Sequence, residues 1–281
     1  MERLKVAGVV VFYQPTDEDI SNISSYLADL DILYVMDNSM ESNEKRIPQD
    51  SKITYIFNHE NLGIAGPLNQ AASLARKAGY HWLLTMDQDT HFPSGVLSSL
   101  KERILEIDTT DIGIVTPWHK TKLKVEKPKE NISYPLDVMT SGNLVNLDIQ
   151  EKIGGFKEWL FIDGVDIEYC LNLRKNGYRV LCFNDLEIDH NLGDIFYRRF
   201  LGKDLLVTNH SAMRRYYQAR NYHYIRDMYV DIEKKFCQTL VKFKSILLAI
   251  VLYENKKWSK IWSYYRGYRD YKKGKRGKSY E

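Results

Sequence analysis

The first half of the chain alternates short apolar runs with segments in which apolar residues recur every three or four positions. The runs have the length of buried strands, and the recurring spacing is typical of a helix with one buried face. The predicted strands cover 5–13, 31–36, 52–57 and 81–86, and the predicted helices cover 17–30, 64–78 and 93–105. Strands that alternate with helices indicate a parallel sheet covered on both faces. The fold class predicted for this half is therefore α/β.

The second half has a less regular pattern. Further strands are predicted at 113–117, 139–146 and 179–184, a helix at 166–176, and a polar loop or flap at 119–135. From about residue 216 the chain is predicted to be helical, and it is aromatic and basic. We therefore expect a main domain over 1–228, with halves at about 1–118 and 119–228, and a helical extension over 229–281.

The amino-acid composition and the cysteines indicate the cellular compartment of the protein. Hydrophobic residues make up 44% and charged residues 27% of the 281 residues, as in ordinary soluble proteins. The three cysteines form no CxxC pattern, so neither a disulfide framework nor a zinc site is predicted, and a reducing, cytoplasmic location is expected. The first apolar run lacks a small-residue cleavage site and is interpreted as a buried strand. No apolar run reaches the roughly 18 residues of a membrane-spanning helix.

Two of the predicted strands end in acidic triplets, Asp37-Asn38-Ser39 and Asp87-Gln88-Asp89. Ligands of parallel α/β sheets bind beyond the carboxyl ends of the strands, so both triplets should face one crevice. Clustered carboxylates repel each other unless a cation lies near them, and Mg²⁺ or Mn²⁺ suits such oxygen ligands. An Asp can also accept the imide N–H of uracil or thymine. Simple turn formation for the first triplet, and a turn or helix cap for the second, are the alternatives.

Three other segments contain candidate binding or catalytic groups. The segment 61–66 (NLGIAG) opens a helix, where glycine permits close backbone approach and the helix N-terminus attracts phosphate; a plain helix cap is the alternative. Asp163, Asp166 and Glu168 begin the helix at 166–176 and exceed what capping needs, so one could act as a general base. His190 falls in a loop, where contact with a ligand is favoured over a structural role.

In this order and spacing, the segments resemble the inverting glycosyltransferases of family 2, which have the GT-A fold. The matching pieces span about residues 5–230 and read VAGVVVFY, MDNS, NLGIAGPLNQA, LLTMDQD, TSGNLV, FIDGVDIEYCLNLRKNGYRV and DHNLGD. The resemblance implies a Rossmann-like, mostly parallel sheet flanked by helices, followed by a C-terminal helical extension. Within the family, FIDGVDIEYC and RRYYQARNYHYIRD are most similar to bacterial rhamnosyltransferases, which use dTDP-L-rhamnose to build cell-wall or capsular polysaccharides.

The resemblance also implies a role for each matching residue. Asp166 would be the catalytic base, and Asp37 would bind the pyrimidine. The nucleotide and donor sugar would be bound by Tyr13, Asp37, Asn38, Asn61, Gly66, Asp87, Gln88, Ser141, Gly142 and His190, the acceptor by Trp159 and Asp163, and Mg²⁺ or Mn²⁺ by Asp89 and His190. The chain departs from the family where Val165 replaces the usual Glu and Asn172 replaces an Arg of many members. These departures leave Asp163 open as a rival base.

The implied activity is transfer of L-rhamnose from dTDP-L-rhamnose to a hydroxyl of a polysaccharide or lipid-linked acceptor. A UDP-hexose or UDP-galactofuranose donor is the alternative within the family. Outside it, the alternatives are a glycoside hydrolase, which also needs two carboxylates but no nucleotide site, and a nucleotide-sugar binding protein without catalysis. Nucleotide binding and sensitivity to a chelator distinguish them.

The basic end of the chain raises a separate question about partners. From Lys256 to Lys278, ten Lys and Arg stand against one Asp, and they are interleaved with Trp258, Trp262 and several Tyr. Contact with an anionic membrane at the inner face of a bacterial cell is predicted in preference to nucleic-acid binding. Packing of this segment on the main domain, or a homodimer through the C-terminal helices, is the alternative.

Overall fold

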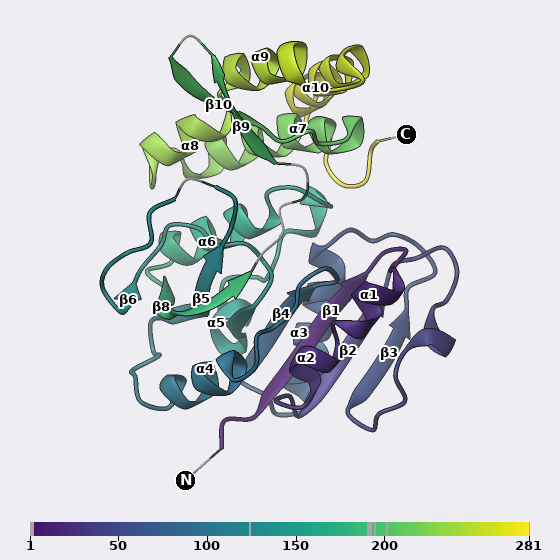
Figure 1. Cartoon of the computed structure of the whole chain (residues 1–281), viewed down its shortest axis with the longest axis vertical. Helices are drawn as coiled ribbons and strands as arrows, with labels where there is room; N and C mark the ends of the chain where they lie inside the picture. The colour runs from purple at the N-terminus through teal and green to yellow at the C-terminus, as the bar shows by residue number, and fades with distance from the viewer. Residues whose placement is uncertain (1–2, 124, 190–192, 194, 201, 281) are drawn as a thin grey trace.

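We describe residues 3–123, 125–189, 193, 195–200 and 202–280 of a computed structural model of the chain. A sheet flanked by helices forms the lower part of the molecule in Figure 1, and a layer of helices with a small hairpin lies above it. The predicted α/β class with a C-terminal helical extension is confirmed.

The central sheet has eight strands in the order β3-β2-β1-β4-β7-β5-β8-β6. They are β1 (Val6–Phe12), β2 (Ile32–Asp37), β3 (Ile53–Phe57), β4 (Trp82–Asp87), β5 (Ile112–Lys120), β6 (Ile132–Ser133), β7 (Asn143–Asn146) and β8 (Arg179–Asp189). The first four strands in chain order pair in parallel, as predicted, whereas β7 is antiparallel to both β4 and β5. The carboxyl ends of β1, β2 and β4 therefore meet at one edge.

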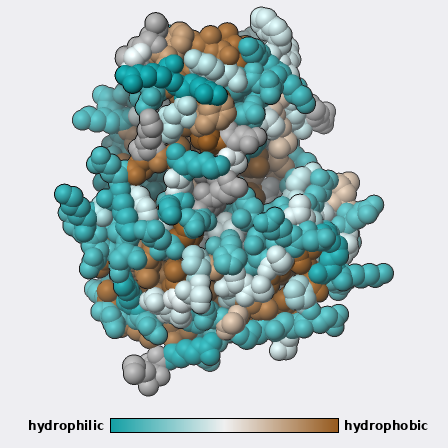
Figure 2. Space-filling view, viewed as in Figure 1, coloured by the Kyte–Doolittle hydropathy of each residue, from teal (hydrophilic) through white to brown (hydrophobic). Residues whose placement is uncertain are grey.

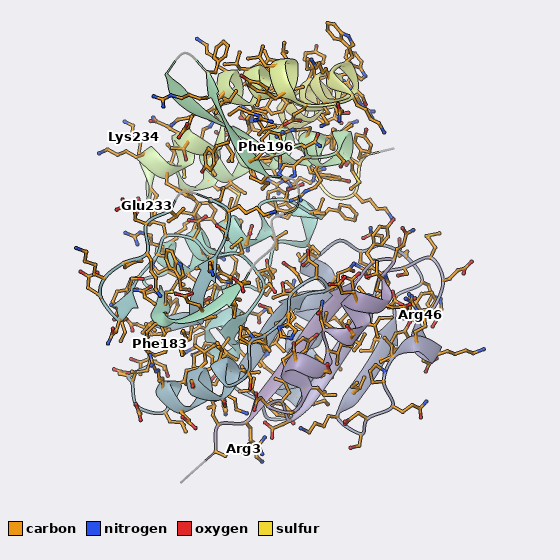
Figure 3. All side chains as sticks on the ribbon, viewed as in Figure 1. Arg3, Arg46, Phe183, Phe196, Glu233 and Lys234 are labelled. Carbon is orange, nitrogen blue, oxygen red and sulfur yellow. The ribbon has the colours of Figure 1, made fainter. Side chains whose placement is uncertain are left out.

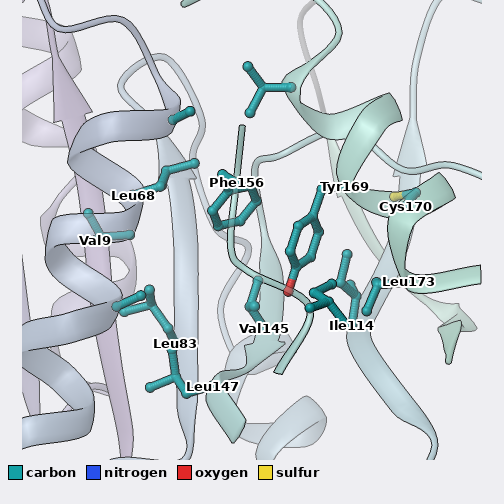
Figure 4. Close-up of a cluster of buried hydrophobic side chains, with 14 of the residues drawn as sticks. Val9, Leu68, Leu83, Ile114, Val145, Leu147, Phe156, Tyr169, Cys170 and Leu173 are labelled. Atoms are coloured by element: carbon teal, nitrogen blue, oxygen red, sulfur yellow. The ribbon is translucent and has the colours of Figure 1, made fainter. Parts of the chain in front are cut away.

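Helices cover both faces of the sheet and enclose two hydrophobic cores. They are α1 (Asp17–Ser21), α2 (Ser24–Leu27), α3 (Ala65–Lys77), α4 (Val96–Ile104), α5 (Leu147–Lys152) and α6 (Val165–Lys175), with short 3₁₀ turns at Glu44–Arg46 and Glu158–Leu160. In one core, Leu68 of α3 and Tyr169 of α6 pack with Val9, Leu83 and Val145 of the sheet (Figure 4). The other core lies under α1, α2 and α4.

The upper layer contains the hairpin of β9 (Phe196–Phe200) and β10 (Lys203–Val207), then α7 (Ala212–Tyr229), α8 (Lys234–Leu240), α9 (Phe243–Tyr253) and α10 (Lys257–Lys272). Helix α10 packs along α7, and α9 packs on β10. Glu233, labelled beside Lys234 at the start of α8 in Figure 3, forms an ion pair of 2.5 Å with Arg174 of α6. The layer is thus tied to the domain below.

Several predicted boundaries were wrong. The helix expected at 17–30 is two short helices, because the hydroxyls of Ser21, Ser24 and Ser25 donate to backbone carbonyls three residues back and compete with the helical pattern. The strand expected at 139–146 begins only at Asn143. The strand at 113–117 extends to Lys120, so the expected loop 119–135 is shorter and contains β6. The hairpin and α5 were not predicted.

One helical stretch departs from the expectation about membrane spans. Lys234–Tyr253 has a mean hydropathy of 1.6 over its apolar window, which suffices for a span by length and composition, and 17% of that window is buried. Val241 and Lys242 separate it into α8 and α9.

Candidate active site

The ends of three adjacent strands place the first group of predicted site residues at one edge. In the sheet, Phe12 pairs with Asp37, and Val11 pairs with Asp87, so the two acids lie on either side of the end of β1. Tyr13, just beyond β1, is 46% exposed. Its N–H donates to the side-chain oxygen of Gln88 at 2.8 Å, and the amide of Gln88 donates to Asp19 at 3.1 Å. Gln88 therefore joins the end of β4 to α1.

Asp37 is fully buried and heavily hydrogen-bonded. Its carboxylate accepts from the Ser39 N–H at 2.9 Å, from the Tyr55 hydroxyl at 2.6 Å, and from the backbone and side chain of Asn43 at 3.1 and 3.0 Å. Burial raises the pKa of Asp37, but these hydrogen bonds outweigh burial and hold the pKa below its usual value. In this structure the carboxylate secures the loop at 39–43, and a pyrimidine would have to replace some of those donors.

The loop before α3 packs against Phe161, in the segment that leads to Asp163 and Asp166. The side chain of Asn61 accepts from the N–H of Gly63 at 2.9 Å, and Asn38 donates to the Gly63 carbonyl at 2.7 Å. Gly63 has φ +76°, and a Cβ there would lie 2.2 Å from the carbonyl oxygen of Phe161, so glycine is required. Gly66 lies in the first turn of α3, where a Cβ would lie 3.7 Å from Leu62.

Asp87, Asp89 and Asp166 belong to one electrostatic cluster. Burial raises the pKa of Asp87 to about 7, the charges of Asp89 and Asp166 add to this rise, and the charge of Arg214 opposes it. Asp89 is exposed, and Asp166 is half-buried at the start of α6. The structure thus brings together two acids from the end of β4 and one that lies 77 positions beyond Asp89 in the sequence.

The segment at 140–142 positions the end of β4. The Asp87 N–H donates to the Ser141 hydroxyl at 3.0 Å, and the Gly142 N–H donates to the Thr85 carbonyl at 2.8 Å. A ring nitrogen of His119 lies 2.6 Å from the Ser141 carbonyl. His119 was not predicted as a site residue; its place at the end of a buried strand is the signal that could have indicated it.

Asp166 has the environment of a group that can take up a proton. Burial raises its pKa to about 6, the Ile167 N–H lowers it through a hydrogen bond of 2.9 Å, and the charges of Asp137 and Asp163 raise it further. The sequence had indicated Asp163 and Glu168 as further acids at the start of this helix. The charge of Asp163 acts on Asp166 together with that of Asp137, which was missed.

Asp163, the rival base, is held by an arginine from α7. Its side chain is 1% exposed, and its carboxylate accepts from Arg214 at 2.6, 3.0 and 3.2 Å. Glu168 instead accepts from the Tyr229 hydroxyl at 2.5 Å, and burial raises its pKa to about 7. Both acids are therefore held by hydrogen bonds from side chains of α7.

Arg214 was not predicted as a site residue. It lies within RRYYQARN, a piece that carried the family resemblance without an assigned role, and it is 51 positions from Asp163 in the sequence. Only packing of α7 over the sheet edge places its guanidinium near Asp163, Asp166 and Asp87.

Trp159 is covered by the C-terminal layer. Its ring meets Tyr224 edge-on at 5.4 Å, the guanidinium of Arg276 lies 4.8 Å from the ring centroid, and its carbonyl accepts from the Gly277 N–H at 2.7 Å. Arg276 therefore covers part of the ring that an acceptor sugar was expected to contact. His190 lies outside the described residues.

The chemistry of Asp87 and Asp89 fits a divalent cation. Mg²⁺ characteristically takes one or two carboxylates together with substrate phosphates. Among the described residues, no group of three or more His, Cys, Asp or Glu is arranged to hold a metal ion by itself. A cation held by Asp87 and Asp89 would therefore complete its coordination with diphosphate oxygens and water.

Comparisons with known proteins show the family to which the chain belongs. The sequence profile of Glycosyl transferase family 2 matches residues 20–169, which include the predicted base and the Asp87-Gln88-Asp89 triplet. The dTDP-rhamnosyl transferase RfbF of Shigella flexneri is 23% identical over 270 residues, which cover 88% of this chain and 86% of that protein.

Solved structures share the fold. Residues 1–349 of S. aureus TarS, in complex with UDP-GlcNAc, match with a TM-score of 0.54 and 14% identity, over 97% of this chain and 93% of that one. GalNAc-T7 with UDP, GalNAc and Mn²⁺ matches with a TM-score of 0.58 and 13% identity; the match covers 83% of this chain and 49% of that one. Because the family profile covers more than half of the sequence, the chain belongs to glycosyl transferase family 2.

Proposed function

We propose that this enzyme transfers L-rhamnose from dTDP-L-rhamnose to a hydroxyl of a cell-surface polysaccharide or lipid-linked acceptor, with inversion at the anomeric carbon. One observation carries the catalytic part: Asp87, Asp89 and Asp166 form a single cluster at the carboxyl edge of the sheet. The donor assignment is supported by the relative that spans 88% of the chain. A UDP-hexose or UDP-galactofuranose donor is the alternative.

The proposed reaction is one displacement. The carboxylate of Asp166 takes the proton of the acceptor hydroxyl while the hydroxyl oxygen forms a bond to the anomeric carbon. The bond from that carbon to the diphosphate oxygen breaks, and its electron pair leaves with the nucleoside diphosphate. A divalent cation, when bound, neutralises charge on the leaving phosphate. The raised pKa of Asp166, about 6, makes it a better proton acceptor than an ordinary Asp while leaving it ionised at neutral pH.

Arg214 has two tasks in this proposal. Its bidentate contact removes Asp163 from competition as a base, and it fixes a positive charge beside the acidic cluster. A fixed guanidinium at this place would stabilise the charge that develops on the diphosphate as it leaves.

The donor is tested by thermal shift with a panel of nucleotide sugars, each with Mg²⁺, Mn²⁺ or a chelator. We expect the largest increase in the unfolding midpoint with dTDP-L-rhamnose, because a ligand that binds only the folded state stabilises it. A larger increase with a UDP-sugar would replace the rhamnose assignment. No increase with any nucleotide sugar, with or without metal, would contradict donor binding altogether.

The base is tested with Asp166→Asn. This change keeps the size of the side chain and removes the proton acceptor, so we expect transfer to fall by roughly 10²–10⁴-fold while the donor-induced thermal shift persists. Asp163→Asn is the matched comparison at the rival position. Near-normal transfer by the Asp166 variant, with loss in the Asp163 variant, would exchange the two assignments.

A further inference from the structure

The helical layer exposes an unusual concentration of large aromatic side chains. Phe243 of α9 and Trp258, Trp262, Tyr265 and Tyr268 of α10 line a groove of about 860 Å³, and we name this set the aromatic face. Trp258 is 84% exposed and Trp262 is 58% exposed, although burial of such rings would stabilise any fold. Residues four and three positions apart lie on the same side of a helix, which explains how 258, 262 and 265 share one surface.

Helix α9 extends this surface with aliphatic side chains. Ala249 and Ile250 are buried, and Ala249 packs against Leu205 and Val207 of the hairpin. Val251 and Leu252 are 44% and 39% exposed. Figure 2 shows hydrophobic side chains gathered at the top of the molecule, over α9. One side of α9 is thus packed, and the other is apolar and uncovered.

Positive charge surrounds the aromatic face. The exposed Lys242, Lys244, Lys256, Lys257 and Lys272 lie on or beside α9 and α10. The acids of this region have partners inside the fold: Glu254 is buried between Arg215 at 2.5 Å and Lys260 at 2.9 Å, and Asp270 accepts from the Tyr216 hydroxyl at 2.8 Å. The surface around the aromatic face therefore presents its lysines with little opposing charge from these acids.

The last residues of the basic segment belong to a different contact. Lys278 donates to the Asn61 carbonyl at 3.2 Å, Arg276 covers Trp159, and the Gly277 carbonyl accepts from Arg220 at 2.5 Å. This part of 256–278 packs on the main domain, which was one of the alternatives for the segment. The exposed Trp and Tyr side chains of this segment therefore lie on α10.

The combination of charges identifies the partner. A second copy docked on this surface about a two-fold axis would place lysines opposite lysines, which is unfavourable. A bilayer with anionic headgroups attracts the lysines, accepts Trp and Tyr rings at headgroup depth, and covers aliphatic side chains below them. A membrane span is not suited to α9, because one of its sides packs on β10 and because the buried ion pairs of Glu254 hold its end within the fold.

We propose that the aromatic face and its lysines dock this enzyme on an anionic lipid bilayer, with α9 and α10 lying in the plane of the surface. Helix α10 packs on α7, and α7 supplies Arg214 to the active site, so docking would hold the site at a set distance from the bilayer. Docking on the bilayer does not depend on the proposed function. Only its purpose, which is access to a lipid-linked acceptor, rests on that function.

The test is co-sedimentation of the full chain with phosphatidylcholine vesicles, with and without phosphatidylglycerol. We expect binding to the anionic vesicles, weakened by salt, and a blue shift of tryptophan fluorescence. Trp258→Ala/Trp262→Ala should lose the shift and bind at least tenfold more weakly, and Lys256→Glu/Lys257→Glu should bind roughly tenfold more weakly. All four residues are exposed, so these variants should fold.

Matched controls separate this surface from general effects. Tyr134→Ala removes an exposed aromatic from the main domain, and Lys45→Glu/Lys77→Glu makes the same change of net charge there; both should bind vesicles like the unaltered chain. The donor-induced thermal shift, measured without vesicles, should be equal in all variants. Failure of donor binding would thus contradict the proposed function without affecting the vesicle result.

Four outcomes would overturn the docking proposal. The unaltered chain could remain in the supernatant with anionic vesicles at low salt. The tryptophan and lysine variants could bind vesicles as well as the controls do. Light scattering without lipid could show a dimer that is absent in the tryptophan variant, which would assign the aromatic face to contact with a second subunit. RNA could displace the chain from vesicles and protect the tryptophans from quenching, which would assign the aromatic face to nucleic acid.

Discussion

At the scale of single residues, the acids of the site differ by what touches them. Asp37 accepts from three donors in the loop that follows it and from the Tyr55 hydroxyl of β3, and Asp163 forms an ion pair with Arg214. Asp166 is held by a backbone N–H and lies among other negative charges. A carboxylate with this surrounding takes up a proton more readily than one already paired with a guanidinium.

The pKa of Asp166 leads to a pH dependence. A base must be ionised to act, and burial with the charges of Asp137 and Asp163 raises the pKa of Asp166 to about 6. We therefore expect kcat/KM for transfer to be constant above pH about 7 and to fall tenfold per unit as pH decreases below about 6. Steady-state rates from pH 5 to 8 with saturating metal check this. A rate that increases toward pH 5 would indicate that Asp166 acts in its protonated form.

Replacement of Arg214 should affect catalysis more than donor binding. Arg214→Ala removes the fixed charge and frees Asp163, and we expect kcat to fall by roughly 10²–10³-fold. Arg214→Lys keeps the charge but not the bidentate contact and should recover part of the loss. Kinetics and thermal unfolding on the same samples distinguish this from simple loss of stability. Transfer within threefold of the unaltered enzyme in Arg214→Ala would contradict the proposed role.

At the scale of elements, the contact between α7 and α10 depends on one small residue. A Cβ on Gly267 would lie 2.1 Å from the Tyr216 carbonyl oxygen, so α10 can approach α7 this closely only at a glycine. The same helix pair is joined by Arg215, Glu254 and Lys260, whose charges are buried together. Removing one charge from such a group leaves the others unpaired in a poorly hydrated environment.

Gly267→Ala is therefore expected to destabilise the protein by about 1–3 kcal/mol, because α10 must move away from α7. Gly66→Ala is the matched control: it also adds a methyl group in a helix, but the nearest atom there is 3.7 Å away. That change should be neutral or stabilise by up to about 1 kcal/mol through helix propensity. Denaturant unfolding of both variants checks the pair, and equal effects would show that the close approach is unimportant.

At the scale of the whole molecule, the extension and the main domain are interdependent. The tail contacts the main domain at Trp159 and Asn61. Arg220 of α7 is fully buried and donates to the Trp159, Leu160 and Gly277 carbonyls. Helix α10 covers Tyr216 of α7. A boundary at 228/229 would separate α7 from the helix that buries it. The C-terminal layer therefore contributes to the stability of the site itself.

Truncation tests this interdependence. A chain ending at residue 228 would expose the side of α7 that α10 covers and would remove Gly277, one of the hydrogen-bond partners of Arg220. We expect it to be insoluble, or to unfold at a lower temperature and to lose the donor-induced shift. An intact shift with an unchanged unfolding midpoint in the truncated chain would support an independent domain over 1–228.

The sequence alone was sufficient for the α/β class, most strands of the first half, and the acids at the strand ends. These features depend on local periodicity and on the rule that ligands bind beyond the carboxyl ends of parallel strands. Prediction failed where contacts are distant in sequence. The antiparallel β7, the early end of α1 and the hairpin at 196–207 depend on partners that local patterns do not specify.

The sequence by itself thus determined the family and the chemical types at the site, because ordered motifs around Asp37, Asp87 and Asp166 are local. Tertiary structure decided how these groups differ. Asp163 and Asp166 are three positions apart, yet Arg214 of α7 forms its hydrogen bonds with Asp163, while the charges that raise the pKa of Asp166 are those of Asp137 and Asp163. It also divided the basic segment into a part packed on the domain and an exposed aromatic face. Both distinctions follow from burial and charge in three dimensions, which residue order does not encode locally.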